Sequence, residues 1–96
     1  GAEPTFLSSL KQYPNPFDQS FTIEYNLVRS LEIDVLIFDQ SGKLVKMLFD
    51  GTQASGKQSL TWDGKDGYGA SVPKGMYSYI MVSEGIIIAK DRMIKM

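Results

Sequence analysis

The chain has 96 residues, 43% of them hydrophobic and 22% charged, a composition that predicts one globular domain with a single core. Its net charge of -1 argues against binding to nucleic acid or to an anionic membrane surface. The sequence contains neither cysteine nor histidine, which excludes disulfide scaffolds, thiolate metal sites and the commonest nucleophile–base pairs. The longest uncharged apolar run, residues 76–82, is far shorter than the roughly 18 residues of a membrane helix, so no membrane-spanning segment is expected.

The start of the chain carries little pattern. Gly1 and Ala2 suggest a cloning remnant, and residues 1–12 as a whole are interpreted as remnant, linker and a possible edge strand. The domain itself is expected to span residues 13–96. It opens with Tyr-Pro-Asn-Pro-Phe at residues 13–17, where two prolines exclude a helix and favour a rigid, extended start.

Alternation of apolar and polar residues predicts the first strands. Residues 21–27 give the clearest strand, and residues 31–38 give the strand around which the fold is expected to be built. Residues 39–42 supply turn chemistry, so residues 44–49 should return as the second strand of a hairpin at the centre of an antiparallel sheet.

The second half of the chain mixes loops and strands. Residues 50–58 are predicted to form an exposed loop and residues 59–62 a short strand with Trp62 pointing inward. Residues 63–75 hold four glycines and are expected to be the largest loop. Residues 76–82 and 86–94 then form two strands around a tight turn.

No window of helical length shows an uninterrupted helical spacing of apolar residues, so the six or seven short strands predict an all-β fold of two antiparallel sheets packed face to face. The three isoleucines at residues 86–88 are expected to be buried, with an apolar docking surface as the alternative. The predicted core consists of Ile23, Tyr25, Ile33, Val35, Ile37, Leu60 and Trp62.

An ordered set of motifs gives the chain a resemblance to known proteins. The set consists of residues 13–17, Ile-Phe-Asp at 37–39 with Gly42, Trp-Asp-Gly at 62–64, Pro-Lys-Gly-Met-Tyr at 73–77 and the basic, apolar end at 90–95. From residue 13 onward the chain resembles the immunoglobulin-like C-terminal modules of bacterial surface and secreted proteins. These include the C-terminal sorting domains of the Bacteroidetes type IX secretion system and the immunoglobulin-like domain of the flagellar hook-capping protein. The resemblance implies an immunoglobulin-like antiparallel β-sandwich of about seven strands.

The function that the resemblance implies is a non-catalytic C-terminal sorting or anchoring module. Such a module directs a larger secreted protein through the type IX secretion system to the cell surface. Its partners would be the outer-membrane translocon, the sortase machinery and an upstream cargo domain of the same chain. The motifs at 62–64 and 73–77 are closer to the hook-capping subtype, so a structural or adhesive immunoglobulin-like module is the alternative, and a carbohydrate-binding accessory domain is a further one.

The end of the chain provides the candidate residues for partner recognition, because it combines basic side chains, apolar side chains and a terminus. They are Lys90, Arg92, Met93, Ile94 and Lys95. The plainer interpretation is that the basic residues protect a sheet edge from pairing with other chains.

Two other groups of residues allow a functional and a structural interpretation. Asp63 and Asp66 are weak candidates for a calcium site, but Asp-Gly pairs commonly form turns, and no metal or other cofactor is expected. The same two carboxylates are poorer candidates for an acid–base pair, so no enzyme is expected. Trp62, Tyr68, Tyr77 and Tyr79 would suit a sugar-binding platform, but core packing is favoured, with only Tyr68 expected outside.

Overall fold

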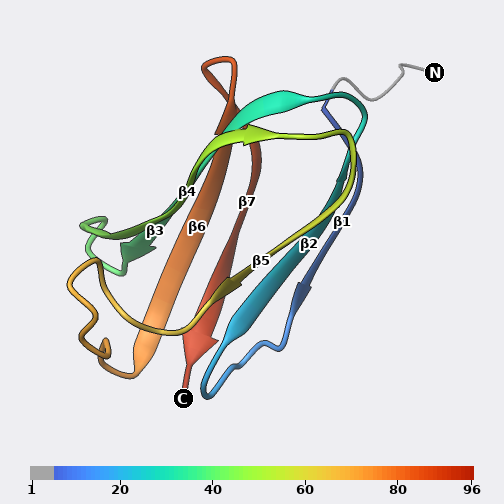
Figure 1. The fold of residues 1–96 in the computed structure, drawn as a ribbon. Helices are drawn as coiled ribbons and strands as arrows, with labels where there is room; N and C mark the ends of the chain where they lie inside the picture. Colours follow the sequence, from blue (N-terminus) through green and yellow to red (C-terminus); the bar gives the residue numbers. More distant parts are fainter. Residues whose placement is uncertain (1–5) are drawn as a thin grey trace.

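A computed structural model describes residues 6–96, which form two antiparallel sheets packed face to face (Figure 1). The seven strands are β1 (Leu7–Tyr13), β2 (Phe21–Leu27), β3 (Leu31–Asp39), β4 (Leu44–Gln53), β5 (Gly56–Trp62), β6 (Gly75–Ser83) and β7 (Ile86–Lys95). The prediction of an all-β, seven-stranded sandwich is confirmed. Among the described residues, no helix has the length and apolarity needed to cross a membrane.

The strand order shows how the chain passes between the sheets. One sheet has the order β1-β2-β5 and the other β4-β3-β6-β7, and every neighbouring pair is antiparallel. The turn after β2 carries the chain from the smaller sheet to the larger. There β3 is an interior strand, as expected, but β4 lies at the edge because β6 takes the other side of β3. The prediction that the whole β3–β4 hairpin is central was therefore wrong.

The alternation in the sequence matches the two faces of each sheet. On β2 and β3 every second side chain is buried between the sheets, while the side chains between them are half-buried or exposed. Six of the seven predicted core residues are buried. Leu60 is the exception: it is only partly buried, although it packs against the core. It lies on β5, an edge strand, where the opposing sheet covers less of the side chain.

An aromatic cluster closes one end of the core. The ring of Phe17 lies 5.7 Å from that of Phe21 and 5.4 Å from that of Trp62, and Trp62 meets the edge of Tyr77 at 5.3 Å. All four side chains are buried. The indole N–H of Trp62 donates to the carbonyl of Lys65 at 2.9 Å, so the one polar atom of that side chain is satisfied.

The start of the sandwich lies ahead of residue 13. Strand β1 occupies the stretch interpreted as linker with a possible edge strand, and it pairs with β2 from Leu7 to Tyr13. The predicted cloning remnant, Gly1 and Ala2, lies outside the described residues.

The prediction of an exposed loop at residues 50–58 was wrong. Strand β4 pairs with β3 as far as Gln53, and β5 pairs with β2 from Gly56 onward. The polar residues that suggested a loop belong to two edge strands, whose outward positions face water. Thr52, for example, donates its hydroxyl to Glu32 on the neighbouring strand at 2.5 Å.

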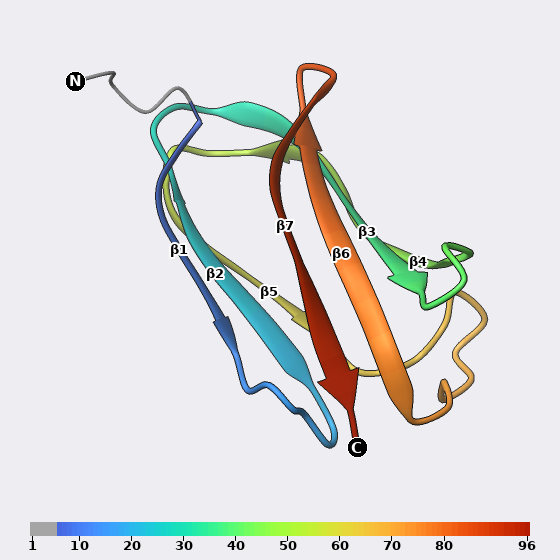
Figure 2. The same cartoon turned by 180° about the vertical axis from the view of Figure 1, so that it is seen from behind.

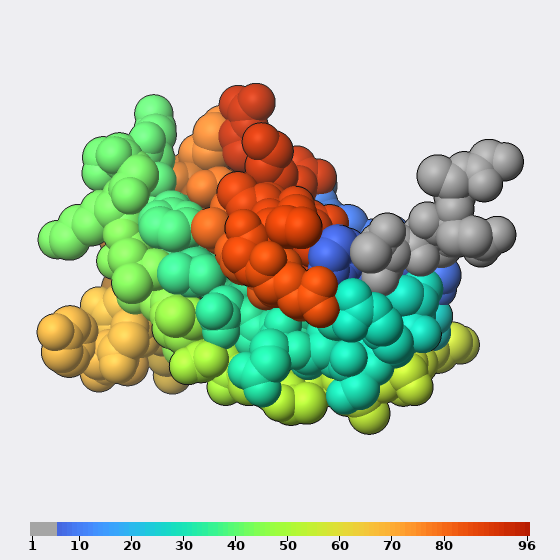
Figure 3. Space-filling model, turned by 90° about the horizontal axis from the view of Figure 1, so that it is seen from above, coloured from blue at the N-terminus to red at the C-terminus, as the bar shows by residue number. Residues whose placement is uncertain are grey.

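The prediction that residues 86–88 are buried was also wrong for two of the three. The side chains of Ile86 and Ile87 are 50% and 52% exposed, whereas Ile88 packs against the core. Strand β7 is the edge of its sheet, and its hairpin with β6 projects beyond the rest of the sandwich (Figure 2). Seen along that direction, the hairpin faces the viewer with no other segment over it (Figure 3).

Truncating a buried isoleucine and an exposed one should show that burial, and not apolar character alone, determines the contribution of a side chain to stability. We expect Ile37→Ala to lower the free energy of unfolding by about 2–5 kcal/mol, because Ile37 is fully buried and truncation leaves a cavity. Urea denaturation measures the loss. The control is Ile86→Ala, at a half-exposed position, where a loss below about 1 kcal/mol is expected. Equal losses in the two variants would contradict this description of the core.

Candidate functional site

The five candidate recognition residues divide between the two faces of β7. Lys90, Arg92 and Ile94 lie opposite Ile80, Ser78 and Met76 of β6. All three point away from the core and are exposed. Met93 faces the core and is fully buried, and Lys95 is half-buried. The structure therefore brings three of the five together on one surface and separates the other two from it.

Met93 and Lys95 hold the fold together. Met93 lies in the core opposite Tyr77. The ammonium of Lys95 donates to the carbonyl of Val72 at 2.7 Å, tying the end of β7 to the loop before β6. The side chain of Lys95 also passes over Gly64, where an added Cβ would lie only 3.3 Å from Lys95 Cε.

The outer face of the larger sheet carries many apolar side chains, and no second layer formed by residues 6–96 covers it. Leu36 of β3 lies opposite Met47 of β4 on one side and Ile80 of β6 on the other, and Ile80 in turn lies opposite Lys90 of β7. We call the following set the outer apolar face: Leu36, Phe38, Leu44, Met47, Met76, Ile80, Val82, Ile87 and Ile94. Apolar surface that extends over several strands often marks an interaction site.

Opposite charges flank the outer apolar face. Lys90 and Arg92 follow β7 along one side. On the other side Asp34 of β3 lies directly opposite Asp50 of β4, and a hydrogen bond with Asp50 raises the pKa of Asp34. A partner docking on this face would therefore meet apolar surface between a basic and an acidic margin.

The segment that precedes β2 clamps the free side of β7. The Asn15 amide donates to the carbonyl of Arg92 at 3.1 Å and accepts from the N–H of Ile94 at 3.0 Å. The N–H of Phe17 donates to the carbonyl of Ile94, and Met96 donates its N–H to the carbonyl of Phe17, both at 2.8 Å. We call this the Asn15–Phe17 clamp. It supplies the bonds that another strand would make, so residues 92–95 lie between the clamp on one side and β6 on the other.

Sequence reasoning identified residues 13–17 as a rigid start but missed the clamp. The available signal was an asparagine between two prolines, since an amide can both donate and accept where the neighbouring Pro nitrogens cannot donate.

Polar side chains bridge the two sheets at the edge where β1 faces β7. Gln12 of β1 donates to the Asp91 carboxylate, and the Tyr79 hydroxyl donates to Gln12. Burial, with a smaller contribution from the Asp91 carboxylate, raises the pKa of Tyr79 to about 12. Tyr79 therefore stays protonated and keeps its role as a donor at any physiological pH.

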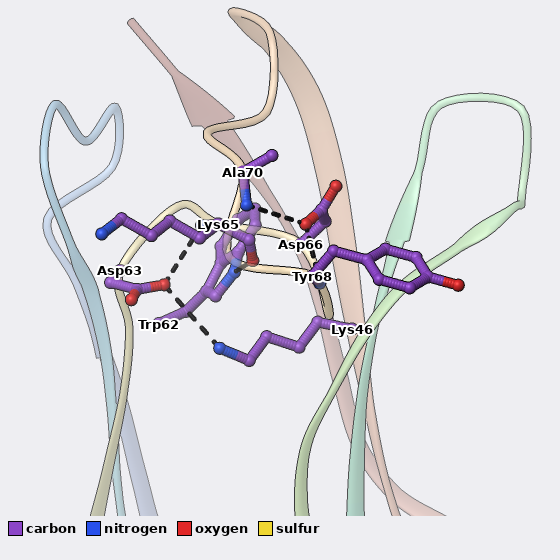
Figure 4. A network of polar contacts seen from close by, with 7 residues as sticks. All are labelled: Lys46, Trp62, Asp63, Lys65, Asp66, Tyr68 and Ala70. Carbon is purple, nitrogen blue, oxygen red and sulfur yellow. Dashed lines mark hydrogen bonds and ion pairs between the residues drawn. The ribbon is translucent and has the colours of Figure 1, made fainter.

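The two calcium candidates are engaged in their own loop (Figure 4). One oxygen of Asp66 accepts the N–H groups of Tyr68 and Ala70, at 2.9 and 3.0 Å. Asp63 accepts the N–H of Lys65 at 3.1 Å and lies 3.9 Å from the ammonium of Lys46. Residues 6–96 contain no group of three or more side chains able to hold a metal ion. The geometry favours turn formation over metal binding.

The same turn occurs twice. Asp39 accepts the N–H groups of Ser41 and Lys43, at 2.9 and 3.0 Å, in the arrangement that Asp66 makes with Tyr68 and Ala70. In each case a glycine three residues after the aspartate has a φ near 85°. The hydrogen bond from the Ser41 hydroxyl, together with the N–H of Lys43, lowers the pKa of Asp39. Both aspartates thus shape loops.

Three of the four candidate platform aromatics lie in the core. Trp62, Tyr77 and Tyr79 are buried, whereas Tyr68 is 99% exposed. Both parts of that prediction are confirmed. The ring of Tyr68 projects outward from the loop (Figure 4).

Comparison with known proteins identifies the family to which the chain belongs. A family model, described as the FlgD Ig-like domain, matches residues 14–85, about three quarters of the chain. The chain belongs to this family. The resemblance inferred from the motifs is therefore confirmed. No curated protein sequence matches the chain.

Solved structures with the same fold include two proteins of Porphyromonas gingivalis and a FlgD protein. PorU from Porphyromonas gingivalis, described as dimeric and latent, has a TM-score of 0.75 and 23% identity over 90% of this chain. FlgD from P. aeruginosa has a TM-score of 0.62 and 24% identity over 88% of this chain. PorZ from Porphyromonas gingivalis has a TM-score of 0.60 and 20% identity over 91%. The present chain corresponds to 9% of the length of PorU, 74% of that of FlgD and 11% of that of PorZ.

The Asn15–Phe17 clamp should contribute measurably to the stability of this FlgD Ig-like domain. We expect Asn15→Ala to lower the free energy of unfolding by about 1–3 kcal/mol, because it removes two hydrogen bonds to β7. Asn26→Ala is a suitable control: Asn26 makes one exposed bond to Ser8, so a change within about 0.5 kcal/mol is expected. Thermal unfolding of both variants checks this, and an Asn15→Ala variant as stable as the parent would refute the clamp.

Calcium should not stabilise this FlgD Ig-like domain. Asp63 and Asp66 already accept backbone N–H groups, and only a ligand bound to the native state raises the melting temperature. We expect millimolar calcium, or a chelator, to leave the melting temperature unchanged. A calcium-dependent rise of several degrees that Asp66→Asn abolishes would instead reveal a site in this loop.

Proposed function

We propose that this FlgD Ig-like domain is a non-catalytic sorting or anchoring module that a secretion partner recognises on the outer face of β7. The observation that carries the proposal is the row of exposed side chains formed by Lys90, Arg92 and Ile94. The Asn15–Phe17 clamp holds the strand that presents this row.

The chemistry of this surface suits recognition by another protein. Apolar side chains on the outer apolar face supply buried area in a complex, and Lys90 and Arg92 orient a partner that carries acidic groups. The proposed partners are the outer-membrane translocon of the type IX system, its sortase machinery and an upstream cargo domain of the same chain. The proposed location is the cell surface or the secreted fraction.

The similar solved structures also support a role in secretion. PorZ is described as an essential bacterial surface component of the type IX secretion system. In PorU and PorZ the matching region is about a tenth of the chain, which is the size expected of a module attached to a larger protein.

A second candidate is a structural or adhesive module like that of the hook-capping protein. The family match supports it, and so does the similarity to FlgD, most of whose chain this domain covers. In that role the outer apolar face would pack against a neighbouring domain or subunit. A sugar-binding role has less support, because three of its four candidate aromatics are buried.

Export of a fusion protein tests the sorting role. A reporter followed by this domain should reach the surface of a type IX-competent bacterium. The double substitution Lys90→Gln with Arg92→Gln should lower surface display by about tenfold, because it removes the charge of the row and leaves the strand in place. A matched control is Lys11→Gln with Lys57→Gln on the smaller sheet, which should export normally.

Substitution is a sharper test than truncation. Removal of residues 90–96 deletes Met93 from the core and the partners of the Asn15–Phe17 clamp, so that variant is expected to unfold. Equal melting temperatures of the two double variants would show that any export defect lies in recognition. Failure of the intact fusion to reach the surface, or full export of Lys90→Gln with Arg92→Gln, would favour the structural role.

A further inference from the structure

A hollow of about 340 Å³ lies between two loops, at the end of the sandwich where β7 terminates (Figure 1). One loop is the turn between β3 and β4, at residues 40–43, and the other is the long loop of residues 63–74. Part of the lining is apolar, and we call this part the apolar wall: Leu44, Val45, Val72 and Pro73. A concave site of this kind, with a few polar groups added, is the usual form of a binding site.

Backbone hydrogen bonds fix the shape of this hollow. The N–H of Gly67 donates to the carbonyl of Val45 at 3.1 Å, which ties the long loop directly to β4. The Tyr77 hydroxyl donates to the carbonyl of Pro73 at 2.6 Å, which ties the end of the same loop to β6. A ligand would therefore meet walls that are already in place, and less ordering would oppose its binding.

An exposed aromatic ring lies beside the hollow. The side chain of Tyr68 is 99% exposed, while its backbone N–H is held by the Asp66 carboxylate at 2.9 Å. Leu44, at the start of β4, is 49% exposed. Covering apolar surface of this kind is favourable, and tyrosines on a fixed backbone are common anchors of protein interfaces. Tyr68 and Leu44 thus indicate a partner that covers the hollow.

The lining of the hollow carries a net negative charge. Asp39 and Asp66 are negative and Lys43 is positive, which leaves one negative charge in excess. In each aspartate it is Oδ1 that accepts the N–H groups of the turn. Within residues 6–96, no hydrogen bond or ion pair engages the other oxygen of either carboxylate, and the Lys43 ammonium pairs with neither. Each aspartate can therefore accept a further donor without losing its turn.

The charge of Asp39 is present at neutral pH and lies close to the buried Tyr77. The Ser41 hydroxyl, followed by the N–H of Lys43, lowers the pKa of Asp39. Burial and, to a smaller extent, the charge of Asp39 raise the pKa of Tyr77, whose side chain also lines the hollow. A cation that enters the hollow would thus meet an ionised carboxylate next to apolar side chains.

We propose that this hollow binds an arginine side chain presented by an extended segment of a partner protein. The methylene groups of that side chain lie against the apolar wall, and the guanidinium donates to the free oxygens of Asp39 and Asp66. The ring of Tyr68 stacks on the planar guanidinium, a contact that arginine makes more often than lysine. The site is separate from the exposed row on β7, so it serves a sorting module and a structural module alike.

Titration with a short peptide tests the proposal. The probe is acetyl-Gly-Arg-Gly-amide, and the readout is the set of backbone ¹H–¹⁵N NMR signals of the domain. Signals of the N–H groups that donate to the two carboxylates should shift; they belong to Ser41, Lys43, Tyr68 and Ala70. One side chain binds weakly, so we expect half-saturation between about 1 mM and about 30 mM at low ionic strength.

A matched peptide separates charge from shape. Citrulline in place of arginine keeps the shape of the side chain but removes its charge, so that peptide should bind at least about fivefold more weakly. Equal binding of the two peptides, shifts that avoid the hollow, or no shift at about 30 mM of the arginine peptide would overturn the proposal.

Variants of the domain locate the site. Asp39→Asn with Asp66→Asn should weaken binding at least about tenfold, and because asparagine can still accept the N–H groups of each turn, the melting temperature should stay close to the parent's. Tyr68→Ala, at a position whose side chain makes no contribution to the core, should weaken binding about threefold. The control is Asp63→Asn, which removes a charge from the same loop outside the hollow and should bind as the parent does.

The outcome does not depend on the double variant folding well. Undiminished binding by Tyr68→Ala, or an equal loss in Asp63→Asn, would place the peptide elsewhere on the surface and refute the site. The same holds for a folded double variant that binds the arginine peptide as tightly as the parent.

Discussion

The rest of the structure depends on the two roles of Phe17. Its ring fills the core between Phe21 and Trp62, and its backbone N–H and C=O pair with the last strand at Ile94 and Met96. A single residue thus joins the aromatic cluster to β7, which lies in the opposite sheet from β2. Because the edges of a two-sheet sandwich are its least covered parts, a tie at this position fixes the strand that would otherwise fray first.

The two halves of β7 consequently differ in how they are held, and its two faces differ in burial. Toward the C-terminus it is held by β6 on one side and by the clamp on the other. Toward the hairpin, β6 is the only segment of residues 6–96 that pairs with it, and Ile86 and Ile87 are half exposed. Across the strand, Met93 is part of the core, while Arg92 and Ile94 face solvent. Alternate residues of one strand can therefore serve stability and recognition without compromise between them.

The sequence correctly predicted the features that depend on residues close together in the chain, namely strand positions and which side chains are buried. Period-two alternation located β2 and β3, and it placed Trp62 and Tyr79 inside, because burial on one face of a strand imposes that pattern directly. It failed at residues 50–58 and at Ile86 and Ile87, since which strands lie at an edge depends on pairing between distant segments. The same alternation would have separated Met93 from Arg92 and Ile94. An asparagine between two prolines marked a donor and acceptor at residue 15, but its partner on β7 could not be predicted, because Asn15 meets that strand only after the sheets have assembled.

The clamp has a mechanical consequence. Strands β1 and β7 run in the same direction on facing edges of the sandwich, so the chain enters at one end of the long axis and leaves at the other (Figure 1). Tension applied between Leu7 and Met96 acts along the strands, and it loads the bonds of β1 to β2 and of Phe17 to β7 together in shear. Bonds loaded side by side must break together, whereas a hairpin pulled from its open end unzips one bond at a time. A force along the length of the domain is thus shared by several hydrogen bonds at once.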